Sequence, residues 1–325
     1  MRQRSIYHEN PIPSYGKISS DIHLLGDMLG ETIVEQEGRR VFNLEESLRT
    51  LSKYARGERE GKKRVTLAKI VHLVGTLSYE ECLALIHSFS TYFQLVNVAE
   101  DHHRVRVLRN WAAKGSRPSV PRVPESIYDL VFTLREHGMN LKQVVDFFSN
   151  LRVELVFTAH PNEARRRTVL LKAAELMKLL LQLDSAAGGS LERRDALQKI
   201  RTNITALWQT DELRNSNPTV LDEVKNGLYY LENVVFPLVP LLYQRIRDAL
   251  YLAYGEQGNA VAIPSCIFFG SWRGSDRDGN PNVTPRMTID TVKMLREALM
   301  KLYDGRLFEL VDKLSQSTRI TTFSP

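Results

Sequence analysis

The chain has 325 residues, of which 43% are hydrophobic and 25% are charged, and its formal net charge at neutral pH is +6. This length can bury one large core or two ordinary ones, and the composition is typical of a soluble globular protein. We find no run of about 18 apolar residues of the kind that spans a membrane, and no apolar segment of a secretory signal at the N-terminus, so we expect no membrane partner.

The positive charge is spread along the chain and mostly lies beside acidic residues, as in RGEREGKKR (56–64) and LERRD (191–195). Such runs are typical of solvated helix faces, so we expect no nucleic-acid partner, whereas small anionic ligands stay open. The two cysteines, Cys82 and Cys266, cannot form a disulfide framework, and both lie in apolar patterns typical of buried, reduced thiols. These features predict a cytoplasmic location.

Taken in chain order, the pattern predicts a mobile tail over residues 1–20 and then a largely helical domain over 21–325. The proline-containing, basic string at about 106–124 predicts a surface loop. Helices are predicted over 21–38, 44–54, 78–105, 126–137, 141–151, 191–214 and 218–255. Within 78–105 the side chains expected to pack inward are Leu83, Leu85, Ile86, Phe89, Phe93, Leu95 and Val96.

Only two segments, 153–158 and 262–269, have the β-branched, extended pattern of strands. Each passes through a polar loop into a helix, the second of which is expected to begin at about Thr284. In folds built from parallel strands, the loops at the carboxyl ends of the strands gather on one face and form the active site. The two loops are therefore expected to meet.

The first loop reads TAHPNEARRR, residues 158–167. Asn162 is placed to cap a helix that begins near Glu163, so His160 would precede a helix N-terminus, which attracts anions. Of Arg165–Arg167 at most two can face one ligand, because successive helix residues are rotated by about 100°. One interpretation is a phosphate or carboxylate site with His160 as acid or base; the other is a capped helix with arginines on a solvated face.

The second loop reads GSWRGSDRDGNP, residues 270–281. Asp276, Asp278 and Asn280 fall at calcium-loop positions, but Pro281 and Met287 stand where an EF-hand needs glycine and glutamate, so we reject that site. The adjacent His102 and His103 complete no metal site either.

Glycines in this second loop let the backbone approach a ligand closely. Trp272 belongs either to the core or to the wall of a pocket. A functional and a structural interpretation of the loop stay equally open. The side chains expected to form an ion-pair network that fixes it are Asp276, Arg277 and Asp278.

These two loops resemble the motifs of phosphoenolpyruvate carboxylase, T-A-H-P-T-[EQ]-x-x-R-R and G-S-W-M-G-G-D-R-D-G-N-P. Further similarity covers LLGDMLGETIVEQEG (24–38), FSTYFQLVNVAEDHHRVR (89–106) and TDELRNSNPTVLDEVKNGLYYLEN (210–233), and so reaches nearly from Asp21 to the end. The resemblance implies a mainly α fold with a few parallel strands, a large helical protein around a small, TIM-barrel-related β-barrel. It also implies that catalysis takes place at the carboxyl ends of the barrel strands.

The resemblance implies a cytoplasmic, allosteric homotetramer that makes oxaloacetate and phosphate from phosphoenolpyruvate and bicarbonate with Mg²⁺ or Mn²⁺, feeding the tricarboxylic acid cycle. Bicarbonate attacks the phosphoryl group, and the resulting enolate of pyruvate captures carbon dioxide from carboxyphosphate. By similarity, His160 handles the carboxyphosphate proton and the Trp272 loop helps to enclose the carbon dioxide. Arg166 and Arg167 match a pair that binds a sugar-phosphate activator in some members.

Three positions depart from the family pattern. Asn162 replaces threonine, and both residues cap helices. Ser275 replaces glycine, which would cost about 1 to 2 kcal/mol if the backbone there were left-handed, and Arg273 replaces methionine and would add a charge beside the pocket. The last two motivate an alternative, a non-catalytic relative that acts as a regulatory or interaction module.

Members of this family are well over twice as long as this chain, which resembles their N-terminal portion. The remainder carries the acidic metal ligands, a second histidine and most phosphoenolpyruvate-binding arginines, so the resemblance implies no metal ligands in this portion. We therefore expect residues 1–325 alone to be inactive.

Overall fold

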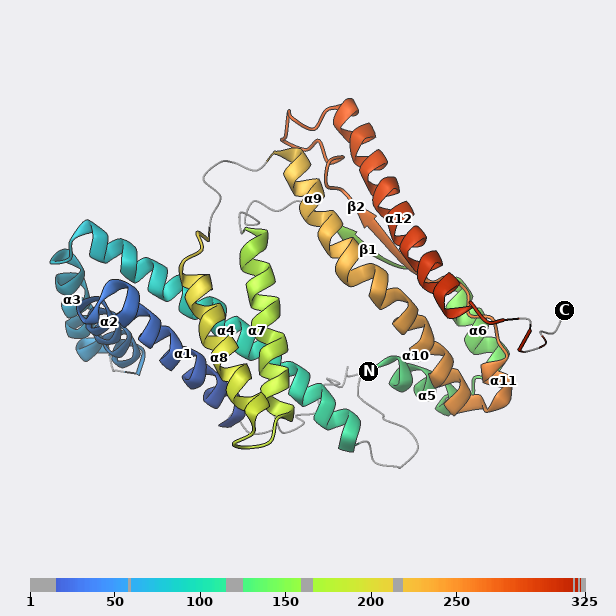
Figure 1. Ribbon diagram of the computed structural model, residues 1–325, viewed down its shortest axis with the longest axis horizontal. Helices are drawn as coiled ribbons and strands as arrows, with labels where there is room; N and C mark the ends of the chain where they lie inside the picture. Colours follow the sequence, from blue (N-terminus) through green and yellow to red (C-terminus); the bar gives the residue numbers. More distant parts are fainter. Residues whose placement is uncertain are drawn as a thin grey trace, which may run out of the picture. The chain divides into compact units, whose positions relative to one another are not determined.

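The computed structural model describes residues 16–57, 60–114, 125–158, 166–212, 219–317, 319, 320 and 322, and these are mainly helical (Figure 1). The chain divides into two compact units, one made of residues 1–110 and 165–213 and the other of residues 111–164 and 214–325. The mainly α character with two parallel strands confirms that part of the predicted fold class.

The first unit is a bundle of helices around a leucine- and isoleucine-rich core. Its helices are α1 (Gly16–Glu37), α2 (Arg39–Gly57), α3 (Glu60–Gly75), α4 (Tyr79–Lys114, most of which lies here), α7 (Arg167–Ser185) and α8 (Leu191–Trp208). Gly38, with φ of +89°, separates α1 from α2 and donates its N–H to the carbonyl of Val34, as a C-capping glycine does. The core includes Leu25, Leu29 and Ile33 of α1, Leu95 and Ala99 of α4, Leu176 and Leu180 of α7, and Ile200 and Ile204 of α8.

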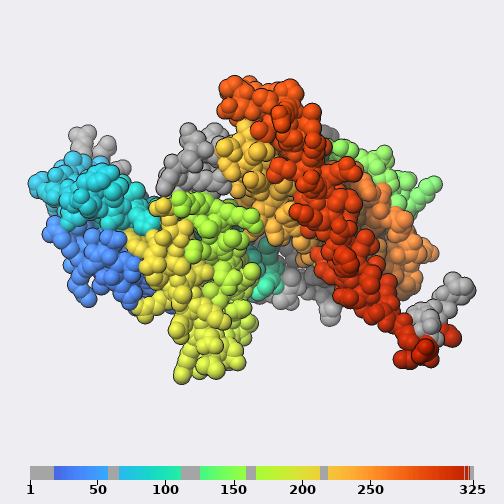
Figure 2. All heavy atoms as spheres, turned by 45° about the horizontal axis from the view of Figure 1, so that its top comes forward, coloured from blue at the N-terminus to red at the C-terminus, as the bar shows by residue number. Residues whose placement is uncertain are grey.

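The second unit contains helices and a short two-stranded sheet. Its elements are α5 (Ile127–Glu136), α6 (Leu141–Asn150), β1 (Val153–Phe157), α9 (Val220–Tyr230), η1 (Leu231–Val235), α10 (Phe236–Tyr254), α11 (Glu256–Asn259), β2 (Ile267–Ser271) and α12 (Pro285–Lys313). Buried residues of α5, α6 and α10 form one core together with Cys266. Figure 2 shows α12 as a red ridge along the surface of this unit.

The predicted helix over 218–255 is α9, η1 and α10 in succession, with a π-helical turn at Leu231–Val235. The turn includes Asn233, the residue whose carbonyl Pro237 would otherwise pair with, because proline has no N–H to donate to the carbonyl four residues earlier. Phe236 instead donates to the carbonyl of Leu231, five residues back.

β1 and β2 pair in parallel over their whole length, from Val153 opposite Ile267 to Phe157 opposite Ser271. The strand predicted over 262–269 therefore begins later, at Ile267. The N–H groups of Cys266 and Ile267 both donate to the Tyr243 hydroxyl, at 3.0 and 3.3 Å, which fixes the start of β2 on α10.

Several predicted boundaries need correction. α4 continues to Lys114, so the first part of the predicted loop at 106–124 is helical. α1 begins at Gly16, within the predicted tail over 1–20, and the sequence does not predict α3. Along α4, Leu85 and Leu95 are buried as expected, but Leu83, Ile86 and Phe93 are exposed.

By length and apolar content, residues 79–110 of α4 could cross a membrane, which corrects the expectation that no stretch approaches such a span. In the first unit, however, this segment packs Leu85, Leu95 and Ala99 into the bundle core. We therefore assign it as a core helix.

Candidate active site

The two strands that precede the motif loops end side by side. Beyond the last pair, Phe157 opposite Ser271, the N–H of Trp272 donates to the Phe157 carbonyl at 2.8 Å. Thr158 and Trp272, the first residues of the two loops, therefore leave the sheet at the same edge. His160, together with the rest of 159–165, lies outside the described residues.

The Trp272 loop is shaped mainly by backbone hydrogen bonds. The N–H groups of Ser275 and Asp276 both donate to the Trp272 carbonyl at 2.9 Å, and the Ser275 hydroxyl donates to it at 3.0 Å. The Trp272 side chain is 56% exposed and so is not a core residue, which leaves it available as the wall of a site.

Gly274 anchors this loop against α9 and α12. Its φ is +76°, and a Cβ there would lie 2.1 Å from Oγ1 of Thr291 and 2.8 Å from Cγ2 of Val224. Only glycine fits both the backbone conformation and the space. The loop is therefore held by close packing at Gly274 while its tip stays exposed.

The predicted ion-pair network within the loop is wrong. Among the described residues no ion pair joins Asp276, Arg277 and Asp278, and all three side chains are exposed. Oδ1 of Asp276 accepts the N–H of Asp278 at 3.1 Å, and Nη2 of Arg277 donates to the Thr288 hydroxyl at 3.4 Å. Turn hydrogen bonds, rather than opposite charges, set the shape of the loop.

The two departures from the family pattern in this loop do not distort it. Among the described residues Glu125 is the only non-glycine residue with positive φ, so Ser275 carries no left-handed strain. Arg273 is only 3% exposed and donates from Nη1 to the Glu223 carbonyl at 3.2 Å, against Gly227 of α9. Its charge is therefore buried against α9, and the expectation of a charge in the pocket is corrected.

At the first junction, α7 begins at Arg167 and not near Glu163. Arg166 is the N-cap, with extended φ and ψ of −67° and 140°, and its N–H donates to the Glu212 carbonyl at 3.2 Å. That bond holds Arg166 outside the helix. The expected capping by Asn162 lies outside the described residues.

The Arg166 guanidinium lies 3.4 Å from the exposed carboxylate of Asp211. Asp211 also lines a polar pocket of about 440 Å³ together with His87 and Trp208. Nε2 of His87 lies 2.7 Å from the Trp208 carbonyl. No spacing in the sequence links Asp211, His87 and Trp208 to Arg166. Only the fold shows that this pocket lies beside the predicted anion site.

The phosphoenolpyruvate carboxylase family model matches residues 18–325. The chain belongs to the phosphoenolpyruvate carboxylase family. It is 39% identical over 303 residues to the phosphoenolpyruvate carboxylase of Roseiflexus castenholzii, covering 93% of this chain and 31% of that protein. The corresponding proteins of Rhodothermus marinus and Thermus thermophilus are 35% and 36% identical, covering 92% and 93% of this chain and 31% and 33% of those proteins. The chain thus spans about a third of the length of these relatives.

The divalent cation implied by the phosphoenolpyruvate carboxylase family does not fit the described residues. They contain no group of three or more His, Cys, Asp or Glu side chains able to hold a metal ion. In the Trp272 loop the two carboxylates are those of Asp276 and Asp278, and Asp276 is already engaged in a turn. Mg²⁺ or Mn²⁺ needs more oxygen ligands than this pair supplies.

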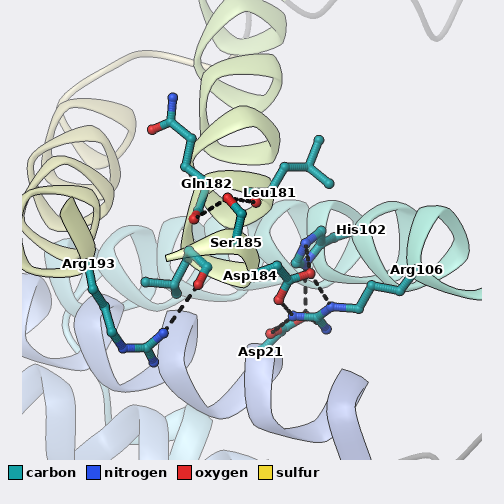
Figure 3. Close-up of polar contacts among 9 residues, drawn as sticks. Asp21, His102, Arg106, Leu181, Gln182, Asp184, Ser185 and Arg193 are labelled. Carbon is teal, nitrogen blue, oxygen red and sulfur yellow. Dashed lines mark hydrogen bonds and ion pairs between the residues drawn. The ribbon is translucent and has the colours of Figure 1, made fainter. Parts of the chain in front are cut away.

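His102, one of the paired histidines, belongs to a buried polar cluster that sequence reasoning missed (Figure 3). Its Nδ1 lies 3.0 Å from Asp21 on α1, and its Nε2 lies 3.1 Å from Asp184 on α7. Arg106 bridges the same carboxylates, with Nη1 at 2.5 Å from Asp21 and Nε at 2.6 Å from Asp184. The cluster joins α1, α4 and α7.

Burial of Asp21 raises the pKa of its carboxyl, but hydrogen bonds from His102 and then Arg106 outweigh burial and leave the pKa lowered. Hydrogen bonds to Asp184, more than those to Asp21, raise the pKa of Arg106. The ionised forms of Asp21 and Arg106 are therefore favoured, and we assign the cluster a structural role in the first unit.

Proposed function

We propose that this chain is the N-terminal part of a cytoplasmic phosphoenolpyruvate carboxylase, which forms oxaloacetate and phosphate from phosphoenolpyruvate and bicarbonate. The observation that carries the proposal is the hydrogen bond from Trp272 to Phe157, which brings together the strand ends that lead into the two motif loops. Family membership and this shared edge of the sheet support one site formed by both loops.

In this proposal the residues of the two motif loops have different roles. His160, two positions after Thr158, exchanges a proton with the carboxyphosphate formed when bicarbonate attacks the phosphoryl group. The exposed indole of Trp272 walls the site where the enolate captures carbon dioxide. Excluding water matters there, because carboxyphosphate and the enolate are both lost to water easily.

Arg166 and Arg167 serve as the anion site in the same proposal. Arg166 stands at the N-terminus of α7, where the helix dipole favours negative charge. Its ion pair with the exposed Asp211 is of a kind that contributes little stability, so a phosphate group can compete for the guanidinium. We propose a sugar-phosphate activator as the ligand, in an allosteric homotetramer.

The metal is proposed to be Mg²⁺ or Mn²⁺, with ligands supplied by polypeptide beyond these 325 residues. When bound, such a cation neutralises charge on the transferred phosphoryl group. The residues of this chain would then bind anions, exclude water and move the proton at His160.

We further propose that both units belong to one catalytic domain built around a small β-barrel. The described sheet has two strands, and the β1 side chains Val153, Leu155 and Val156 are exposed. Apolar strand residues normally lie against other elements, so additional strands and helices are expected to cover them. Polypeptide equivalent to the rest of the relatives' length is the proposed source.

The competing hypothesis, a non-catalytic relative, was motivated by Arg273 and Ser275. Arg273 is buried against α9, and Ser275 has an ordinary backbone conformation. Neither substitution distorts the backbone of the loop or places a charge in the proposed site, so we favour the active enzyme.

Replacing His160 by asparagine in the full-length parent tests the assignment. We expect oxaloacetate formation to fall by about 10²-fold or more, since general acid–base catalysis contributes about that much. Circular dichroism should show an unchanged fold.

The matched control is His137→Asn, which alters an exposed histidine of the second unit whose ring Nδ1 lies 2.8 Å from the Thr133 carbonyl. It should retain nearly full activity. A His160→Asn enzyme with more than a few per cent of wild-type turnover would contradict the role given to His160.

A further inference from the structure

A groove of about 980 Å³ lies between α1 and α2 in the first unit, apart from every residue used in the proposed function. Tyr92 of α4 and Arg201 of α8 complete its lining. Gly30 brings the Phe42 ring against the α1 backbone, where a Cβ would lie only 2.8 Å from Cε2 of that ring. The apolar lining includes Ile22, Leu29, Ile33, Phe42 and Tyr92.

Glu45 places a carboxyl group in this apolar groove. On α2 it shares the inward face with Val41 and Leu48, and it is only 7% exposed. A carboxylate at such a core position is costly unless a counter-charge or hydrogen-bond donor meets it.

Two of the four lysine and arginine side chains that line the groove, Arg49 and Arg201, pair with carboxylates other than Glu45. Arg49 donates to Glu46 from Nε at 2.7 Å and from Nη2 at 2.5 Å. Arg201 pairs with Glu31 and Glu35. Among the described residues no cation lies within 4.0 Å of the Glu45 carboxylate. Burial, and next the charge of Glu46, raise the pKa of Glu45 to about 7.

We propose that this groove binds a small organic ammonium ion with an apolar body, whose nitrogen pairs with Glu45. A buried carboxylate without a counter-ion selects a cation, and the apolar walls select a hydrocarbon or aromatic body. The volume matches a small molecule, since such pockets usually measure about 300 to 1,000 Å³. The ammonium ion would supply the counter-charge for the Glu45 carboxylate.

Binding should depend on pH, because the ammonium ion pairs with the ionised carboxyl. The charged and titratable groups that share the groove with Glu45 are His23, Asp27, Glu31 and Glu35 of α1, Arg39, Glu46, Arg49 and Lys53 of α2, Tyr92 of α4, and Arg201 of α8. With a pKa of about 7, Glu45 is mostly protonated at pH 6 and mostly ionised at pH 8. Affinity should therefore rise about tenfold between these pH values.

Three probes with the same six-carbon chain test the proposal on the full-length parent: hexylammonium, hexanol and hexanoate. Binding is followed through the backbone amide resonances of Gly26 and Gly30, which report on the groove. Hexylammonium should shift both resonances to saturation, hexanol should bind at least tenfold more weakly, and hexanoate should not bind.

Glu45→Gln should weaken hexylammonium binding at least tenfold and remove the pH dependence. The control Glu37→Gln, at the exposed end of α1 and outside the groove, should change neither. His23→Gln should keep the pH dependence. A cooperative thermal unfolding transition shows that each variant is folded. If Glu45→Gln does not fold, Glu45→Met replaces it in the binding experiment. The proposal is overturned if hexanol binds as well as hexylammonium, if the Glu45 variants retain binding, or if no probe shifts these resonances.

Discussion

Asp21 shows how a single buried charge can matter to the first unit without any role in chemistry. Its carboxylate accepts from His102 and from Arg106, and its side chain is 8% exposed. Because the folded-state pKa is lowered, the carboxylate stabilises the protein at neutral pH. That contribution is lost as pH falls below the ordinary value of 3.8 and through the lowered folded value.

Asp21→Asn should therefore lower the free energy of unfolding at neutral pH by about 3 kcal/mol, because it leaves a buried cation without part of its counter-charge. The loss should shrink as pH falls towards acid, where the wild-type carboxylate is protonated as well. Thermal unfolding across this pH range measures both effects. Asp101→Asn, on the exposed face of α4, is the control and should be close to neutral; an equal loss in both variants would refute the cluster's role.

The sequence identifies some residues of this protein much better than others. The motif residues Trp272 and Asp276 were found because they lie together in the chain, whereas Asp21, His102 and Asp184 are distant in sequence and share no spacing. The adjacent histidines are visible in the sequence, but nothing in it indicates that Asp21 and Asp184 lie against His102. Packing of α1, α4 and α7 alone brings them together.

At the scale of elements, the loop between β2 and α12 depends on how closely Gly274 packs against two helices. Gly274→Ala would place a methyl group 2.1 Å from Thr291 and 2.8 Å from Val224, in a left-handed conformation. We expect a destabilisation of about 2 to 4 kcal/mol, from strain together with overpacking, and a corresponding fall in the thermal midpoint of the second unit.

Gly279→Ala separates the two causes. Gly279 has a similar φ of +69°, but a Cβ there would meet nothing within 4 Å, so only the conformational cost of about 1 to 2 kcal/mol applies. Equal losses in the two alanine variants would show that packing against α9 and α12 does not anchor the loop. In the full-length parent, Gly274→Ala should also reduce turnover more than Gly279→Ala.

Element boundaries were predicted less well than element types. The prolines that signal a loop begin only at Pro118, while the preceding arginines and alanines are good helix formers, so α4 continues to Lys114. Conversely, Pro264 lies inside the predicted second strand, and β2 begins three residues later because a proline cannot donate to the sheet. The predicted start of α7 near Glu163 is wrong because Arg166 donates its N–H to the carbonyl of Glu212, and the sequence around Arg166 does not indicate this distant partner.

At the scale of the whole molecule, the chain spans about a third of its relatives and exposes apolar side chains on α12. Phe308 is 72% exposed, and further exposed members of this face include Val292, Tyr303, Leu307 and Val311. An apolar surface of this extent marks an interaction site or an aggregation hazard. The chain passes from one unit to the other near residues 110, 164 and 213. The amino-acid composition does not change at these positions in a way that predicts the division.

We expect the 325-residue chain alone not to turn over phosphoenolpyruvate, because its described residues supply no metal site. A coupled oxaloacetate assay with magnesium and bicarbonate checks this, and sedimentation checks the expected self-association. Supplying in trans a polypeptide equivalent to the rest of the relatives' length should restore activity and solubility. Activity of the isolated chain within tenfold of a full-length relative would refute the expectation.

The parallel pairing of β1 with β2 also has a consequence for the order of events during synthesis. Val153 pairs with Ile267, which follows it by 114 residues (267 − 153), so β1 leaves the ribosome long before its partner exists. At translation rates of about 5 to 20 residues per second, the segment Val153–Phe157 waits roughly 6 to 23 s without its partner strand. This short apolar strand is then open to mispairing, and the edge that joins the two motif loops can assemble only after Ser271 has been synthesised.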